Sequence, residues 1–219
     1  MITLKLHESK NCILDKIQKT FDDWAENGRS ELMEKEHAKT VLKFIKTIKF
    51  KKNFSFLDIG CGNGWAIRKI SSNDDCQKAV GIDKSKKMIE NAKEKSISKK
   101  EKFIQTDIES WRTKEEYDYV FSIESLYYSD SVENALKKIY KLIKEGGEFF
   151  CGTDFYKENK STTNWSKKMG VTMHLYSEIE WKKLFENAGF KTKTRHVKNS
   201  KGNRKWKREL GTLFIIGTK

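Results

Sequence analysis

The stretch FSFLDIGCGNG, residues 54–64, decides the fold. Its first six residues form an apolar run of strand length, and three alternating glycines follow it directly. A helical pattern from Trp65 to Ile70 comes next. Glycine permits a tight turn and lets backbone N–H groups approach a ligand, and a helix N-terminus favours a negatively charged group. The stretch therefore predicts a strand, a ligand-binding glycine turn and a helix.

The same alternation continues toward the C-terminus. Apolar patterns predict strands at residues 79–83, 102–106, 117–123 and 148–153, and helices over residues 84–95 and 131–144. Strands that alternate with helices form a parallel sheet with helices on both faces. Residues 191–197 and 210–218 then predict two last strands joined by a basic turn, which would add an antiparallel hairpin to the sheet.

The two remaining segments have other patterns. Residues 11–50 carry apolar side chains at helical spacing, which predicts a helical N-terminal segment. Residues 156–176 are polar with scattered aromatics, which is typical of a loop or a short helical lid. A length of 219 residues suits one domain with such an elaboration.

Composition excludes several classes. No apolar run approaches the ~20 residues of a membrane helix, and the N-terminus lacks a secretory signal, so we expect a cytoplasmic protein without a membrane partner. Cys12, Cys61, Cys76 and Cys151 are widely separated, so no zinc site or other metal site is expected. The net charge of +14 can indicate nucleic acid, but lysine is spread over every segment and proline is absent. We interpret the charge as compositional bias.

Three acids end predicted strands around the glycine turn: Asp58, Asp83 and Asp107. Asp83 lies ~20 residues beyond the turn, the spacing at which a carboxylate can accept ribose hydroxyls. A dinucleotide fingerprint is disfavoured because its sixth position is Trp65, and a P-loop is absent. The set suits a ligand with a cationic amino acid part, a ribose and an adenine.

Four stretches resemble the motifs of class I S-adenosylmethionine-dependent methyltransferases, namely residues 57–64, 80–93, 103–108 and 117–124. The resemblance covers residues 54–155. It implies a Rossmann-like α/β fold with a seven-stranded, mostly parallel sheet, helices on both faces and an antiparallel terminal hairpin. Residues 1–50 would then be a helical cap, and residues 51–219 the methyltransferase domain, with a lid-like insertion around 156–176.

The resemblance also implies a cofactor site for S-adenosyl-L-methionine, which leaves as S-adenosyl-L-homocysteine. Its glycine turn would wrap the methionine part, Asp58 would hold the ammonium, Asp83 the ribose, and Asp107 the adenine edge. The implied cofactor residues are Trp24, Arg29, Asp58, Gly60, Cys61, Gly62, Asn63, Gly64, Asp83, Lys84, Met88, Asp107, Ile108, Ser122 and Ile123.

Methyl transfer is an in-line displacement on carbon, so alignment supplies much of the catalysis. A general base is needed only for an acceptor that carries a proton. The candidate catalytic residues are Glu124, Tyr128 and His174, and Tyr127 and Asp154 are further candidates for the same role. His37, alone in its segment, is more typical of a surface or packing histidine.

The acceptor is predicted to be a small molecule. Residues 123–126 read Ile-Glu-Ser-Leu, and no proline is present, which disfavours the Pro-Pro motif of base amino-methyltransferases. The aromatic segment 156–176 would cover a small acceptor. One alternative is methylation of RNA or protein through the basic hairpin 198–208, where Trp206 could stack on a base. Others are a non-catalytic nucleoside-binding module, a nicotinamide oxidoreductase and an aminopropyl transferase.

Overall fold

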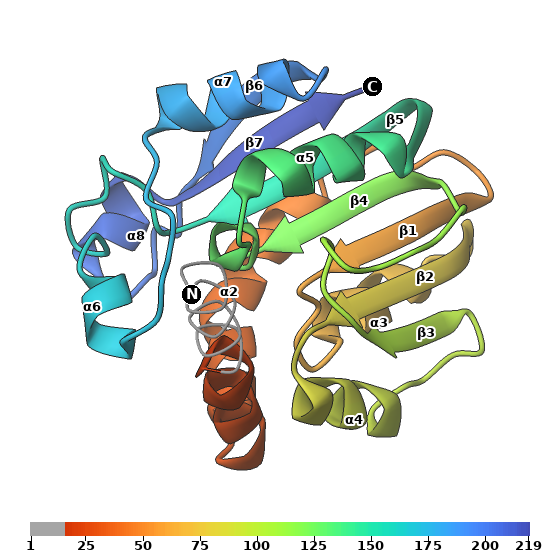
Figure 1. Ribbon diagram of the computed structural model, residues 1–219, viewed down its shortest axis with the longest axis horizontal. Coiled ribbons are helices and arrows are strands. Elements are labelled where there is room, and N and C mark those ends of the chain that lie inside the picture. Colours follow the sequence, from red (N-terminus) through yellow and green to blue (C-terminus); the bar gives the residue numbers. More distant parts are fainter. Residues whose placement is uncertain (1–15) are drawn as a thin grey trace, which may run out of the picture.

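The computed structural model describes residues 16–219, which form one seven-stranded sheet in the order β3-β2-β1-β4-β5-β7-β6 (Figure 1). The strands are β1 (Phe54–Ile59), β2 (Cys76–Asp83), β3 (Glu101–Gln105), β4 (Tyr117–Ile123), β5 (Ile143–Thr153), β6 (Lys191–Val197) and β7 (Thr212–Thr218). Strands β1 to β5 pair in parallel, and β7 runs antiparallel to both β5 and β6. The predicted fold class, with its antiparallel terminal hairpin, is confirmed.

Helices cover both faces of the sheet. They are α2 (Arg29–Ile45), α3 (Trp65–Ser71), α4 (Lys86–Glu94), α5 (Val132–Lys141), α6 (Trp165–Met169), α7 (Glu178–Asn187) and α8 (Lys205–Glu209), with a 3-10 helix η1 (Leu126–Tyr128). Buried side chains of α5 and α7 pack on one face, and those of α2, α3 and α4 pack on the other. Residues 16–26 are also helical. Two apolar cores therefore sandwich the sheet.

The central strands and the helix starts follow from local sequence. Strands β1 and β4 are buried along nearly their whole length, as expected of parallel strands with helices on both faces. The hydroxyls of Ser85 and Ser131 accept hydrogen bonds from the backbone N–H of Met88 and Asn134, which caps α4 and α5. The local signals thus fix where the elements after β2 and β4 begin.

The predicted boundaries between α5 and β5 were wrong. The predicted helix 131–144 ends at Lys141, and β5 begins at Ile143, which pairs with Tyr117 in the sheet. An apolar residue at helical spacing cannot be distinguished from the first residue of a buried strand by periodicity alone. The pairing partner decides the conformation there, and Gly146, at φ 73°, accommodates an irregular stretch inside the strand.

The predicted basic turn 198–208 contains the short helix α8, and β7 begins at Thr212 instead of residue 210. Trp206 and Lys207 are buried, because the Trp206 ring packs edge-on against Trp165 and the Lys207 ammonium pairs with Glu36. A solvated turn would leave both exposed. These contacts hold the segment against α6 and α2.

The described part of the chain contains no helix long and apolar enough to span a membrane. The first 15 residues of the predicted N-terminal cap, with Cys12, lie outside the described residues. Within the predicted lid, Asn159 and Thr162 donate hydrogen bonds from their side chains to the carbonyl oxygen of Asp154. That part of the segment is therefore tied to the end of β5.

Candidate functional site

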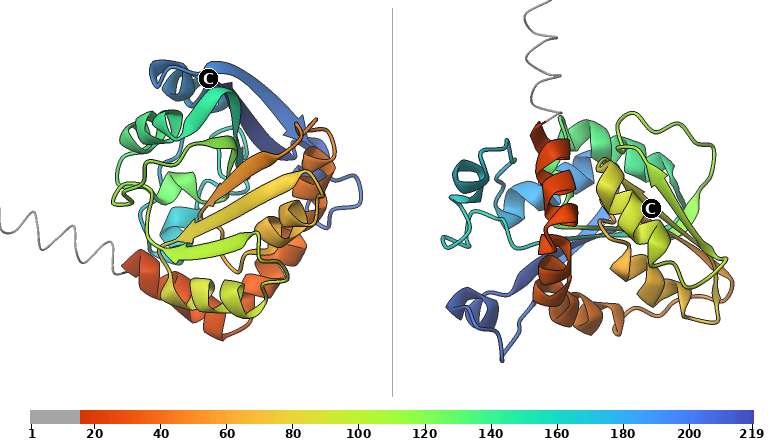
Figure 2. Two further views of the ribbon diagram at one scale, coloured as in Figure 1. Left: turned by 90° about the vertical axis from the view of Figure 1, so that its right-hand side faces the viewer. Right: turned by 90° about the horizontal axis from the view of Figure 1, so that it is seen from below.

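A pocket of about 740 Å³ opens at the carboxyl ends of the strands, where the strand order reverses about β1. In Figure 1 the arrowheads of β1 to β4 point toward the red and orange helices of residues 16–45, and Figure 2 shows these helices from two other sides. Open parallel sheets bind their ligands at such a reversal, in pockets of roughly 300–1,000 Å³.

Most of the predicted site residues line this pocket. They are Trp24, Arg29, Asp58, Gly60, Cys61, Gly62, Asn63, Asp83, Lys84, Met88, Asp107, Ile108, Ile123, Glu124 and Tyr128. Gly64, Ser122 and His174 are not in the lining. Ser122 is fully buried in β4. The His174 ring stacks on Tyr176, and the backbone N–H of His174 donates to the carbonyl oxygen of Tyr127.

The glycine turn is shaped by its neighbours. Gly60, Gly62 and Gly64 all have positive φ, at 74°, 52° and 77°. A Cβ at Gly60 would lie 1.8 Å from the hydroxyl oxygen of Ser125, and one at Gly64 would lie 2.7 Å from the Phe103 ring. Close packing therefore requires glycine at both ends of the turn, and Gly64 serves the contact between helix α3 and the sheet.

Asp83, the last residue of β2, holds this turn in place through hydrogen bonds. One carboxylate oxygen of Asp83 accepts from the backbone N–H of Gly62 at 2.9 Å, and the other accepts from the N–H of Ser85 at 2.8 Å. Burial raises the pKa of Asp83 to about 6, although these two hydrogen bonds oppose the shift. The carboxylate is thus held in place, with further lone pairs available to hydroxyl donors in the pocket.

Asp58 and Asp107 flank Asp83. Burial, and secondarily the charge of Asp83, raises the pKa of Asp58 to about 7. Burial would also raise the pKa of Asp107, but hydrogen bonds from Ser110 and Glu109 outweigh it and lower that pKa. Asp58 and Asp83, whose pKa values burial raises, would be ionised more readily beside a positive charge, so they suit a cationic ligand.

The N-terminal helices close one side of the pocket. The Arg29 guanidinium lies 4.0 Å from the centre of the Trp24 ring, and Trp24 contacts Phe21 edge-on. The Asn63 amide in the glycine turn donates to Glu34 of α2 at 3.0 Å. Helix α2 is therefore attached to the glycine turn itself.

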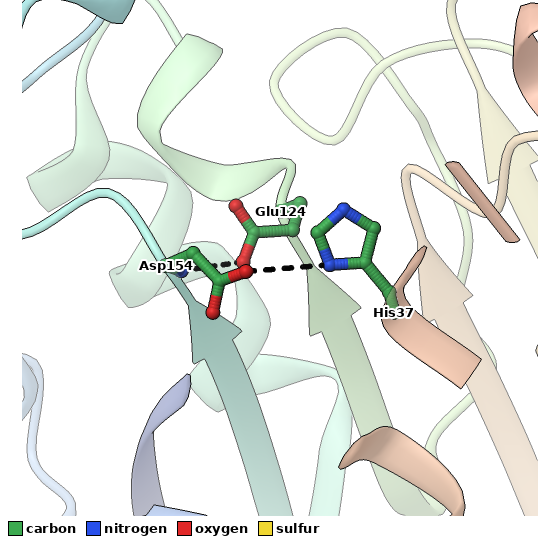
Figure 3. A group of neighbouring side chains, drawn as sticks. All are labelled: His37, Glu124 and Asp154. Carbon is green, nitrogen blue, oxygen red and sulfur yellow. Dashed lines mark hydrogen bonds and ion pairs between the residues drawn. The ribbon is translucent and has the colours of Figure 1, made fainter. Parts of the chain in front are cut away.

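A second group of acids lies over β4 and β5 (Figure 3). Glu124 follows β4 with a positive φ of 54°, which is uncommon for a residue other than glycine. Its carboxylate accepts from the Tyr127 hydroxyl at 2.9 Å and from the Asp154 N–H at 2.5 Å. Asp154 in turn accepts from the Thr212 hydroxyl at 2.6 Å and lies 3.6 Å from Nδ1 of His37.

The charges of this group are perturbed by burial. Burial, and secondarily the nearby Asp154, raises the pKa of Glu124 well above its ordinary range. Burial lowers the pKa of His37, against the attraction of Asp154. Sequence reasoning missed His37 as a site residue, because its partners lie on distant segments. Asp154 carried a signal like that of the other acids, which is a position at the end of a strand.

The sheet order, the glycine turn and the acids at the strand ends define a class I S-adenosylmethionine-dependent methyltransferase. The chain belongs to the family described as “Methyltransferase domain”, whose match covers residues 27–194. The predicted family is thereby confirmed.

Similar proteins carry methyltransferase names. A malonyl-[acyl-carrier protein] O-methyltransferase of Priestia megaterium is 27% identical over 135 residues, which is 62% of this chain and 47% of that protein. A sterol 24-C-methyltransferase of Aspergillus fumigatus is 27% identical over 154 residues, 64% of this chain and 40% of that protein. The chain thus spans about half the length, or less, of these relatives.

Among solved structures, a putative methyltransferase in complex with the Haloferax volcanii Trm112 methyltransferase activator shares the fold, with a TM-score of 0.85 and 24% identity. The likeness covers 90% of this chain and 96% of that one. Most of the chain therefore follows one known architecture.

Proposed function

We propose that this protein transfers the methyl group of S-adenosyl-L-methionine to a small acceptor bound in the same pocket. The observation that carries the proposal is that the two ends of the pocket have different linings. One end, over β1, β2 and the residues after β3, holds the glycine turn with Asp58, Asp83 and Asp107. The other end, over β4 and β5, holds Glu124, with aromatic side chains from α6 and α8.

The cofactor would occupy the first end. Asp58 would attract its ammonium, Asp83 would accept the ribose hydroxyls, and Asp107 with Ile108 would border the adenine. Lys84 and Met88 would lie beside the adenine. The sulfonium methyl would then point past Gly60 toward Ile123 and Glu124. S-adenosyl-L-homocysteine would be the product left in the pocket.

A small acceptor is favoured by what lines the second end. Trp165, Met169 and Trp206 give it apolar walls, as small-molecule pockets typically have. The alternative of RNA methylation needs an accessible Trp206 for base stacking, whereas its side chain is only 7% exposed. The named relatives act on a malonyl group carried by a protein and on a sterol, so the acceptor could also be carrier-bound.

The test is transfer of a labelled methyl group. The full chain is incubated with radiolabelled S-adenosyl-L-methionine and a cell extract divided into RNA, protein and metabolite fractions. We expect the metabolite fraction to gain the label. Label only in the RNA fraction would contradict a small acceptor, and no S-adenosyl-L-homocysteine binding in calorimetry would contradict the cofactor assignment.

Asp83→Asn tests the proposed contact between Asp83 and the cofactor ribose. The asparagine amide can accept only at its oxygen, so it loses one bracing bond and the charge that strengthens bonds from ribose hydroxyls. We expect S-adenosyl-L-homocysteine affinity to fall about 10- to 100-fold, from the ~1.5–3 kcal/mol of a charged hydrogen bond. Asp74→Asn, on an exposed side chain, should leave the calorimetric affinity unchanged.

The raised pKa of Asp58 predicts a pH-dependent affinity. Below the pKa of about 7 the free carboxyl is protonated, and above it the carboxylate is ionised and attracts the cofactor ammonium. Affinity for S-adenosyl-L-homocysteine should therefore rise about tenfold from pH 6 to pH 8 and then level off. Calorimetry in buffers of different ionisation enthalpy should detect proton release on binding at pH 6. Asp58→Asn should remove most of both effects and leave the smaller part expected from Asp83, whose pKa is raised to about 6.

A further inference from the structure

The acceptor end of the pocket brings together three side chains that can ligate a metal. His37 comes from α2, Glu124 follows β4 and Asp154 follows β5 (Figure 3). One nitrogen or oxygen atom of each lies within 4.8 Å of those of the other two, and all three residues line the pocket. We propose that they bind one divalent first-row metal ion, such as Mn²⁺ or Zn²⁺.

The distance between His37 and Asp154 fits such an ion, and Glu124 has a ligand atom within 4.8 Å of both. Tetrahedral ligands about 2.1 Å from a metal lie about 3.4 Å apart. Nδ1 of His37 and Oδ2 of Asp154 are 3.6 Å apart, so an ion can sit between them with little movement. An imidazole with two carboxylates suits Zn²⁺, Mn²⁺ or Fe²⁺ better than Mg²⁺ or Ca²⁺, whose ligands are oxygen atoms.

The carboxylates are already held by outer partners. The Tyr127 hydroxyl donates to Glu124, and the Thr212 hydroxyl donates to Asp154 on the oxygen that does not face His37. Metal-binding carboxylates are usually oriented by hydrogen bonds of this kind. Because these partners fix both carboxylates, the protein orients the free lone pairs of Glu124 and Asp154 before any ion binds.

Charge balance points the same way. Glu124 and Asp154 place two carboxylates together, and Asp154 is only 1% exposed. The neighbouring cation, Lys207, pairs with Glu36 at 2.5 Å. A divalent ion would balance the charge of these two acids when both are ionised.

The role of the ion rests on the proposed function, whereas its binding does not. An ion at the acceptor end would take up an acceptor hydroxyl and lower its pKa. The hydroxyl proton would pass to solvent and the oxygen would attack the methyl carbon. The carbon–sulfur bond would break with its electron pair remaining on sulfur. The inferred acceptor is therefore a metal-binding hydroxyl compound.

The experiment measures metal binding by the full chain. After treatment with a chelator, the protein is titrated with Mn²⁺ and Zn²⁺ in calorimetry, and bound metal is counted by mass spectrometry after dialysis. We expect one equivalent per chain, and at least about tenfold weaker binding in His37→Ala and Asp154→Asn. Co²⁺ should give an absorption band in wild type that both variants lose.

The matched control is His196→Ala. His196 also pairs with a carboxylate, Glu178, at 2.8 Å, but this pair lies outside the pocket. Its removal should leave metal binding unchanged. Glu124→Gln replaces Asp154→Asn if the latter unfolds.

Absence of a stoichiometric ion in wild type, or an affinity unaffected by the ligand variants, would overturn the metal site. S-adenosyl-L-homocysteine binding is measured on the same samples. If that binding persists without metal binding, the metal site fails and the proposed function stands.

Discussion

Gly60→Ala should reduce S-adenosyl-L-homocysteine affinity by on the order of 100-fold, because it displaces the turn that borders the cofactor. The added Cβ meets the Ser125 hydroxyl at 1.8 Å, so either the glycine turn or the segment after β4 must move. The residue also has a φ of 74°, which costs alanine roughly 1–2 kcal/mol. Calorimetry with S-adenosyl-L-homocysteine measures the affinity, and thermal unfolding measures the stability.

Two variants separate the two effects of Gly60→Ala, which are the collision of the new Cβ with Ser125 and the strain of the backbone. Gly146→Ala introduces the same kind of strain at φ 73°, with no atom within 4 Å of the new Cβ. It should lower stability by the same roughly 1–2 kcal/mol and leave the affinity for S-adenosyl-L-homocysteine intact. The double variant Gly60→Ala with Ser125→Gly removes the collision and should recover part of the affinity. If Gly60→Ala binds as tightly as wild type, the turn does not border the cofactor.

Phe44→Ala should destabilise the protein by about 3–5 kcal/mol, the range found for large aromatic side chains deleted from a core. Phe44 lies on α2, is 1% exposed and stacks on Phe214 with ring centres 3.9 Å apart. It also contacts Phe150 edge-on. The melting temperature should fall by roughly 10 °C, and loosening of α2 should weaken cofactor binding as well.

Leu32→Ala is the control for Phe44→Ala, since both residues lie on α2. Leu32 is 57% exposed, so its truncation should change stability by less than about 0.5 kcal/mol. Denaturant titration compares the two variants. Equal and small effects would mean that α2 is not part of the core.

Much of the fold could be predicted because its signals are local. The apolar run at residues 54–59 and the glycines after it define β1 and its turn without reference to the rest of the chain. The predictions were wrong at Ile143 and in residues 198–208, where local pattern was ambiguous or polar. There, strand pairing and the burial of Trp206 decided the conformation.

The cofactor side of the site was predictable for the same reason. Asp58, Asp83 and Asp107 each lie within two residues of the end of a strand, and parallel strands bring their carboxyl ends to one edge of the sheet. His174, chosen for its chemistry alone, lies outside the lining. Position relative to a strand end was therefore a better guide than residue type.

The sequence by itself determined the alternation of strands and helices, the glycine turn and the acids beside it, because hydrophobic period and turn chemistry act over a few residues. Only the tertiary structure decided that His37 meets Glu124 and Asp154, as 87 and 30 residues separate these neighbours along the chain. The docking of α2 over the strand ends joins them. That docking depends on packing summed over the whole core, which no short pattern encodes.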